Sequence, residues 1–526
     1  MTVYIFNLLV NYFPCGVDNA QAYRAGMLDA ICGSVRYVYT KLPTARELNY
    51  YERIGIPINE MICAHQYFTD NHSLRAGGRV DVKLEKLRGS LHYTDIRYEN
   101  DRINLLKNSR IIASIALCGE HKEYFHRILY FKEAKLIRTE VYTDGLLYAE
   151  YYMTAVSEGR PYAKLTRRTF FNRNGSVAYD QIFDENKEWY LFPDGRCCTK
   201  SEFLAEFVKK LNLTEKNVVL LDRFSQFDFV QPLFRFGNRA RFIAVVHSGH
   251  YFEKNETPNR LYLNSDYFYL FKYARFVDKI VVSTQEQKKE FMEKQREHGQ
   301  RVSEIEVIPA GGISRLRYPE TGRKPYSLLA VSRLDTDKRV DWIIKAVIKA
   351  HRENPEVSLT IYGNGKPAYI QELQCLAIEN DAQQYIRFMG YADVTEVYKD
   401  YEVFLSSSLL ETLGLSVMEA VGSGMAAIGL NVKYGNRLFI HPGENGYLVD
   451  ADPENVGDGE RQIEDMAGKI VEIFRDRERL EVFHRRSYEI AGEFLSSKIQ
   501  EKWKRLLREG DEYVENLFGD NEGSAL

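Results

Sequence analysis

Two glutamates, Glu411 and Glu419, lie eight residues apart around a turn that ends in Gly414. The apolar run 403–405 before this turn is typical of a buried strand, and the residues from Leu415 onward have helical spacing. Such a turn aims unpaired backbone amides at the carboxyl edge of a sheet, where α/β folds bind ligands and where a diphosphate is favoured. The turn predicts an anion pocket beside a carboxylate. The alternative is that Glu419 complements the helix dipole in the first helical turn and Glu411 is solvated.

A second strand-to-helix turn carries two cations, Arg333 and Lys338. The β-rich run 326–331 precedes them, and an amphipathic helix is predicted from Val340 to about Arg352. A planar guanidinium and a compact ammonium in one turn can converge on a single anion, although loop cations are often only solvated. Together, the two turns predict a pocket able to hold a nucleoside diphosphate as a leaving group.

The N-terminal part repeats the strand-to-turn pattern. Residues 3–10 read as a buried strand, Gly16 lets the main chain approach a ligand, and a helix is predicted from about Asp18. Further on, a predicted strand over 242–246 ends at His247. An ordinary βα turn and a structural histidine are the alternatives at these two places.

Arg333 and Lys338, followed by Glu411-x7-Glu419, resemble in order and spacing the donor site of retaining GT-B glycosyltransferases. The resemblance implies that the two cations and the amides near Gly414 hold the departing UDP. It also implies that Glu411 orients the sugar and that Glu419 bonds the ribose. Retention would let the phosphate take the acceptor's proton, so no protein base is expected. The catalytic candidates are Arg333, Lys338, Glu411 and His247, and the binding candidates are Gly16, Val17, Asp18, Asn19, Tyr391, Ala392, Thr412, Leu413, Gly414, Leu415 and Glu419.

The run 16–24, Gly-Val-Asp-Asn-Ala-Gln-Ala-Tyr-Arg, resembles the catalytic subunit of the O-GlcNAc transferase that modifies serine-rich adhesins of the accessory Sec system. The resemblance implies transfer from UDP-GlcNAc, or from UDP-glucose, to Ser/Thr hydroxyls. The implied partners are an adhesin and a homologous, non-catalytic GT-B co-subunit. Two other functions stay open: a wall teichoic acid α-GlcNAc transferase, and a non-catalytic glycan-binding co-subunit. No permanent cofactor and no metal are expected, and Asp335-Thr-Asp337 and Asp450-Ala-Asp452 are read as chance matches to a metal motif.

Residues 73–198 are predicted to form an antiparallel β domain inserted in the N-terminal half. Alternation over 79–85 predicts a strand, and Asp-Gly or Asn-Gly pairs at 144–145, 174–175 and 194–195 predict hairpins. In the resembling family this insert contacts the partner subunit and helps to hold the acceptor. Side chains predicted either to serve that interface or to pack the sheet are Tyr148, Tyr151, Arg167 and Phe170.

The 526 residues predict three domains, at about 150 residues each. These are two Rossmann-like domains, 1–72 with 199–315 and 316–509, around the insert, followed by a loose acidic tail over 510–526. Ser201 is predicted to cap a helix that ends near 213, and the last helix is predicted over 496–508.

A net charge of −3 gives no reason to expect nucleic-acid binding. Seven cysteines, an odd number, favour a reducing compartment over a disulfide framework. Neither a signal peptide nor an apolar span is evident, so we expect a cytoplasmic protein, with peripheral contact at the inner face of the membrane as the alternative.

Overall fold

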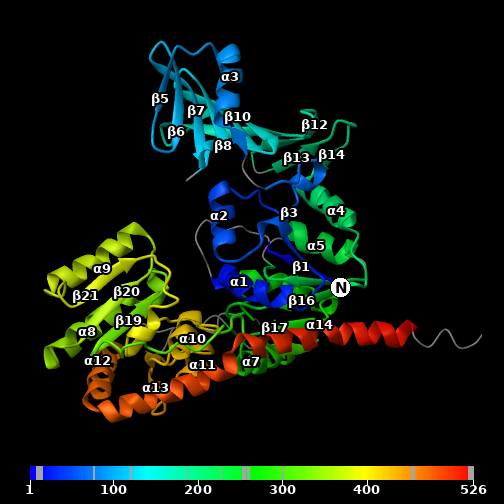
Figure 1. Cartoon of the computed structure of the whole chain (residues 1–526). Helices are drawn as coiled ribbons and strands as arrows, with labels where there is room; N and C mark the ends of the chain where they lie inside the picture. The colour runs from blue at the N-terminus through cyan, green and yellow to red at the C-terminus, as the bar shows by residue number, and fades with distance from the viewer. Residues whose placement is uncertain are drawn as a thin grey trace, which may run out of the picture. The chain divides into compact units, whose positions relative to one another are not determined.

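The computed structural model describes residues 1–7, 16–74, 77–118, 121–185, 187–224, 227–237, 239–251, 256–257, 261–298, 301–451 and 457–518. Within these, only the backbone is described for 45–46, 227–228 and 509–518. The chain divides into two compact units, Met1–Cys15 with Cys32–Phe242, and Gly16–Ile31 with Ile243–Leu526. Figure 1 labels the elements of both units.

A parallel sheet opens the first unit. Strand β1 pairs with β15 on one side and with β2 on the other, and β3 pairs with β2. Val3, Ile5 and Phe6 of β1 are fully buried, as expected for a central parallel strand that is covered on both faces. The elements are β1 (Thr2–Phe6), β2 (Ser34–Tyr39), β3 (Met61–Cys63), β15 (Asn217–Leu221), α2 (Ala45–Arg53), α4 (Lys200–Leu211) and α5 (Phe227–Phe236).

Three sequence predictions in this unit need correction or lie partly outside the described residues. The first strand ends at Phe6, and 8–10 are not among the described residues. The sequence also predicts a strand over 61–69, but strand β3 stops at Cys63, because a 3-10 turn follows over Gln66–Phe68. Helix α4 is capped by Thr199 and not by Ser201: the Thr199 hydroxyl accepts the Glu202 N–H while the Glu202 carboxylate accepts the Thr199 N–H.

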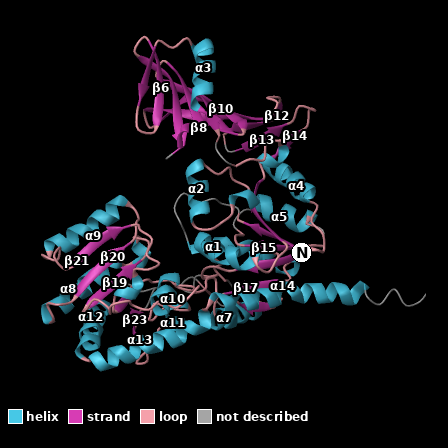
Figure 2. Cartoon of the chain, in the orientation of Figure 1, coloured by secondary structure: helices cyan, strands magenta, loops and turns pink. Residues whose placement is uncertain are grey.

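The insert is an antiparallel sheet in the first unit, and it is nearly all strand in Figure 2. Its order is β14-β13-β12-β11-β10-β9-β8-β7-β6-β5, with β4 paired to β8. All three predicted hairpins are confirmed, since they join β9 to β10, β11 to β12 and β13 to β14. The bounds are β4 (Gly78–Arg79), β5 (Asp95–Tyr98), β6 (Arg102–Lys107), β7 (Arg110–Cys118), β8 (His121–Lys132), β9 (Lys135–Thr143), β10 (Gly145–Ser157), β11 (Arg160–Phe171), β12 (Val177–Asp184), β13 (Lys187–Leu191) and β14 (Cys197–Thr199).

The strand predicted over 79–85 is wrong, because this segment begins helix α3 (Val80–Leu91). Its apolar residues also recur every three or four positions, at Val80, Leu84, Leu87 and Leu91. That spacing puts them on one helix face, which packs on the sheet core around Phe125 and Ile128. Burial of this face outweighs the local alternation.

An aromatic core joins the insert to the rest of the first unit. Phe170 is fully buried and stacks on Tyr179 with ring centroids 4.5 Å apart, and His65 stacks on Phe170 at 5.6 Å. Tyr148 is also buried, so it and Phe170 pack the sheet and are not surface residues. Of the four predicted interface side chains, only Arg167 is exposed, and Tyr151 is half-buried beneath its guanidinium.

The second unit contains strands β16 (Arg241–Val245), β17 (Lys279–Val282) and β18 (Ile305–Val307), which run parallel; β16 begins at the unit boundary. The seven strands of the first parallel sheet have the order β18-β17-β16-β15-β1-β2-β3. Helices of this part are α1 (Gly16–Asp29), α6 (Phe268–Lys272) and α7 (Gln285–Glu297).

A second parallel sheet of six strands, order β21-β20-β19-β22-β23-β24, also lies in the second unit. Its central strands β22 and β23 are buried at every residue, which explains their uninterrupted apolar runs. The elements are β19 (Ser327–Val331), β20 (Ser358–Tyr362), β21 (Ile386–Gly390), β22 (Val403–Ser406), β23 (Ala426–Leu430), β24 (Gly446–Val449), α8 (Val340–Glu353), α9 (Pro367–Glu379), α10 (Leu415–Gly422) and α11 (Gly435–Phe439).

Three helices, α12 (Glu460–Arg475), α13 (Arg477–Ala491) and α14 (Ser496–Phe518), end the described chain. Helix α14 packs on α1, where Arg24 lies over the Trp503 ring and Gln500 donates to the Met27 carbonyl at 3.1 Å. It continues ten residues beyond the predicted end at 508, so the expectation of a loose tail from 510 is wrong as far as Phe518. Among the described helices, none has the length and apolarity needed to cross a membrane.

Candidate functional site

The turn after strand β22 has the predicted form. Gly414 has φ +79°, a left-handed conformation that suits glycine, and it caps helix α10. In the described chain, the amides of Thr412, Leu413, Gly414 and Leu415 donate to no backbone carbonyl. These amides are therefore available to an anion at the helix N-terminus.

Lys338 joins the two predicted turns. Its Nζ lies 2.7 Å from Glu411 Oε1 and 2.8 Å from Ser408 Oγ, with about a sixth of either charged side chain exposed. The lysine ends the 3-10 turn Thr336–Lys338 after β19, and Ser407 Oγ fixes that turn by donating to the Lys338 carbonyl at 2.7 Å. The predicted convergence of the two turns is present, and Glu411 is paired and not solvated.

Arg333, at the start of the turn that Lys338 ends, pairs with two aspartates of that turn. Its guanidinium contacts Asp335 Oδ2 at 3.1 Å and Asp337 Oδ2 at 3.3 Å, and Lys338 Nζ lies 3.9 Å from the same Asp337 oxygen. Half of the Arg333 side chain is exposed. The carboxylates of the Asp335-Thr-Asp337 motif thus bind a guanidinium, and Asp452 of the other motif lies outside the described residues.

Glu419 lies inside the protein. It is the fifth residue of α10, so it is not in the first helical turn as the alternative reading required. Its two carboxylate oxygens accept hydrogen bonds from the phenols of Tyr23, in α1, and of Tyr398, the latter at 2.8 Å. Burial raises the pKa of Glu419 above its ordinary value, while the two phenols oppose that shift. A small cavity is lined by Tyr23, Arg317, Thr395, Tyr398 and Glu419.

The other predicted site residues lie on separate elements of the second unit. Gly16 is exposed and starts α1, Asp18 is buried, and Val17 and Asn19 are half-buried. His247 follows β16 as predicted, and its backbone N–H donates to the Tyr267 hydroxyl at 2.9 Å. Tyr391 and Ala392 are exposed directly after β21. Their roles stay predictions.

Sequence reasoning missed Ser408 and the two phenols on Glu419. Ser408 belongs to a run of three serines that begins at the end of β22, and polar residues past a buried strand are a usable signal. Tyr23 is almost 400 residues from Glu419 in sequence, and no local pattern indicates that contact.

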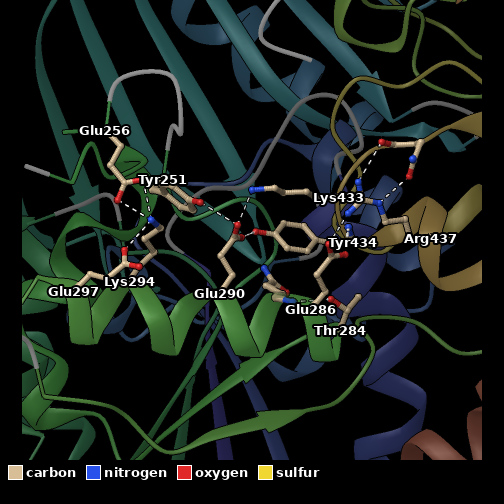
Figure 3. A network of polar contacts seen from close by, with 12 residues as sticks. Tyr251, Glu256, Thr284, Glu286, Glu290, Lys294, Glu297, Lys433, Tyr434 and Arg437 are labelled. Atoms are coloured by element: carbon tan, nitrogen blue, oxygen red, sulfur yellow. Dashed lines mark hydrogen bonds and ion pairs between the residues drawn. The ribbon is translucent and has the colours of Figure 1, made fainter. Parts of the chain in front are cut away.

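In the described chain, one group of carboxylates and histidine is close enough to share an ion: Glu256, Glu297 and His298. The ammonium of Lys294 lies 2.8 Å from Glu256 Oε1 and 2.8 Å from Glu297 Oε2 (Figure 3). A protein cation thus already binds both carboxylates.

Comparison with known proteins agrees with this architecture. Residues 96–194 match the family described as the GtfA extended beta-sheet domain, and residues 325–475 match the glycosyl transferases group 1. The UDP-N-acetylglucosamine–peptide N-acetylglucosaminyltransferase GtfA subunit of Streptococcus pneumoniae is 34% identical over 97% of this chain and 99% of its own length.

Two solved structures are similar over nearly the whole chain. The pneumococcal O-GlcNAc transferase GtfA in complex with UDP and GlcNAc has a TM-score of 0.88 at 33% identity, covering 97% of this chain and 99% of its own. A structure of a GtfA/B complex gives 0.85 at 32% identity, covering 97% and 100%. The fold is therefore GT-B, with two Rossmann-like sheets and an antiparallel domain in the N-terminal half, and the chain belongs to the GtfA family of glycosyltransferase subunits.

Proposed function

We propose that this chain is the catalytic subunit of a protein O-GlcNAc transferase that moves GlcNAc from UDP-GlcNAc to Ser/Thr hydroxyls of a serine-rich adhesin. The observation that carries the proposal is the contact of Lys338 with Glu411, which brings the two predicted donor-site turns together. Similarity along nearly the whole chain to a GtfA solved with UDP and GlcNAc supports the same donor.

The leaving UDP gains negative charge on its diphosphate as the sugar–phosphate bond breaks. Lys338, Arg333 and the free amides of 412–415 would supply positive groups at that place, where they act most strongly on the transition state. For this, Arg333 exchanges its two aspartate partners for phosphate oxygens, and its half-exposed side chain is free to do so.

Glu411 would accept hydrogen bonds from the sugar hydroxyls, because Lys338 keeps its carboxylate at the mouth of the turn. Glu419 and its neighbouring cavity would take the ribose, with Tyr391 and Ala392 at the uracil. We further propose retention of configuration without a metal: the acceptor attacks the face that UDP leaves, and a phosphate oxygen takes the hydroxyl proton. His247 would lie near the transferred sugar, and Gly16–Asn19 would lie against the donor and the acceptor.

A homologous, non-catalytic co-subunit is part of this proposal, as in the GtfA/B complex. Met153, Val156 and Tyr162, around the β10–β11 hairpin of the insert, are exposed apolar side chains. Such side chains suit a protein interface better than the buried Tyr148 and Phe170. A cytoplasmic location, with peripheral contact at the membrane, is part of the same proposal.

The decisive experiment offers labelled UDP-GlcNAc and UDP-glucose to the full chain with a Ser/Thr-rich repeat peptide, with and without the co-subunit. We expect transfer from UDP-GlcNAc that survives a chelator. Transfer only to poly(ribitol phosphate) would favour the teichoic acid enzyme. Binding of glycosylated peptide without any transfer would make the chain the glycan-binding subunit.

A further inference from the structure

Two carboxylates of helix α7 hold the segment that follows strand β23 (Figure 3). Glu286 and Glu290 are one helical turn apart, so they lie on the same face of α7. Glu286 Oε1 accepts from Arg437 at 2.7 Å, and Glu290 Oε1 accepts from Lys433 at 2.7 Å and from Tyr251 at 2.9 Å. Both carboxylates are thus committed to this contact.

The residue between those cations, Tyr434, is held at both ends. Its backbone N–H donates to Glu286 Oε2 at 3.0 Å, and its phenol donates to Glu290 Oε2. Tyr434 has φ +74°, which is rare for a residue with a side chain, and it is almost fully buried. Such a conformation persists only where the surroundings impose it, and here the two carboxylates do so.

The backbone of Tyr434 and Gly435 contacts the backbone of the Glu411–Gly414 turn. The Gly435 N–H donates to the Glu411 carbonyl at 2.8 Å, and Glu411 and Tyr434 form a bridge of the parallel type. A Cβ on Gly435 would lie 2.5 Å from the Leu413 carbonyl oxygen. The backbone that carries the predicted diphosphate amides therefore rests on the backbone that α7 fixes.

We propose that Glu286 and Glu290 are positioning residues for the donor site, acting through Tyr434 and Gly435 on the Glu411–Gly414 turn. The inference rests on the function proposed above. No other described element reaches both ends of Tyr434, and the ion pairs to Lys433 and Arg437 alone would not fix its backbone. The two carboxylates do not touch the donor; they fix the positions of Glu411 and of the turn amides at the moment when UDP departs.

The test measures transfer kinetics, UDP affinity and thermal midpoint for full-length Glu286→Ala and Tyr434→Phe, with the co-subunit present. Glu286→Ala removes the acceptor of the Tyr434 N–H, and Tyr434→Phe removes only the phenol bond. Because misplacement of reacting groups by about 1 Å can cost about 100-fold, we expect kcat to fall about 10-fold or more in both. The KM for the acceptor peptide and the thermal midpoint should stay near wild type, which a merely structural role would not give.

A double-mutant cycle tests whether Tyr434 and Glu290 act through their shared hydrogen bond. Glu290→Ala already removes the acceptor of the Tyr434 phenol, so adding Tyr434→Phe to it should cost no further activity. Glu293→Gln is the matched control, since Glu293 also lies on α7 and its one ion pair within the described residues is with Lys289, at 4.0 Å. Its kcat should stay within about twofold of wild type, the scale of a weak surface ion pair.

A kcat close to wild type in both Glu286→Ala and Tyr434→Phe would overturn the inference, as would full additivity of Tyr434→Phe with Glu290→Ala. Failure of the proposed function looks different, because the wild-type protein itself would then neither bind UDP nor transfer sugar.

Discussion

The proposed donor-site turns and the inserted sheet both contain carboxylates beside cations, but these carboxylates differ in how many hydrogen-bond donors already surround them. In the insert, Glu140 accepts from Tyr130 and Tyr142 at 2.7 Å each, and it pairs with Arg138 and Lys83. At the turns, Glu411 has the ammonium of Lys338, and the amides of 412–415 donate to no described carbonyl. The strand-face carboxylate of Glu140 is saturated by neighbours on its own strand, on the adjacent strand and on helix α3. A carboxylate in a turn past a buried strand keeps capacity for a ligand.

The largest effect should come from Lys338→Ala. Loss of one preorganised donor at a developing charge typically costs about 100- to 1,000-fold, or about 3–4 kcal/mol, so kcat for sugar transfer should fall by that factor. Steady-state kinetics with UDP-GlcNAc give the number. Lys349→Ala is the control, since Lys349 lies on α8 and pairs with surface glutamates. Near-normal turnover in Lys338→Ala would contradict the proposal that the turns, unlike the insert, serve a ligand.

Glu140→Ala should lower the stability of the protein and leave its ligand binding unchanged. It leaves two phenols and two cations without their shared acceptor, so we expect the free energy of unfolding to drop by about 2–3 kcal/mol. UDP affinity should not change. Denaturant unfolding and calorimetric titration measure the two quantities, with the exposed Glu123→Ala as reference. A loss of UDP affinity at unchanged stability would show that the insert carries ligand chemistry after all.

His65 offers a pH test within the first unit. Burial lowers the pKa of His65 to about 3, so the folded state keeps it neutral while the unfolded chain binds a proton below its ordinary pKa. The contribution of neutral His65 to the free energy of unfolding is complete above about pH 6.5. It is lost as the pH falls towards 3, by about 1.4 kcal/mol per pH unit. His65→Phe should make the fall in unfolding free energy shallower by that slope between pH 6 and 4. Parallel curves for the two proteins would contradict the assignment.

The smallest expected effect is a gain in stability. Glu133 and Ala134 join β8 to β9 with φ +52° and +60°, the conformation in which hairpins favour glycine at the second position. Ala134→Gly should therefore raise the free energy of unfolding by about 0.5–1 kcal/mol. Ala163→Gly, within strand β11, should lower it by a similar amount. Thermal unfolding of both variants checks the sign.

Local patterns predicted most of the fold. Buried apolar runs gave the parallel strands, and Asp-Gly and Asn-Gly pairs gave the hairpins of the insert. The prediction failed where two periods fit one segment, as at 79–85, where packing of Leu84 and Leu87 selected a helix. It also failed at Ser201, because a capping box two residues earlier satisfies more amides.

The site was predictable only as far as its turns. Residue types and spacing indicated that Lys338 and Glu411 would meet, because both follow strands of one sheet. The partners that fix the geometry are remote in sequence: Tyr23 at Glu419, and α7 at Tyr434. Such contacts depend on tertiary packing, which no window of sequence contains.

The pairing of Lys338 with Glu411 also bears on which anions can enter. An ammonium that already faces a carboxylate offers little net charge to an approaching ion, so a lone inorganic phosphate gains little by displacing the partner. A nucleotide sugar brings a diphosphate for the lysine and hydroxyl donors for the glutamate in one molecule. In the proposed donor site, this ion pair would therefore favour ligands that satisfy both charges together.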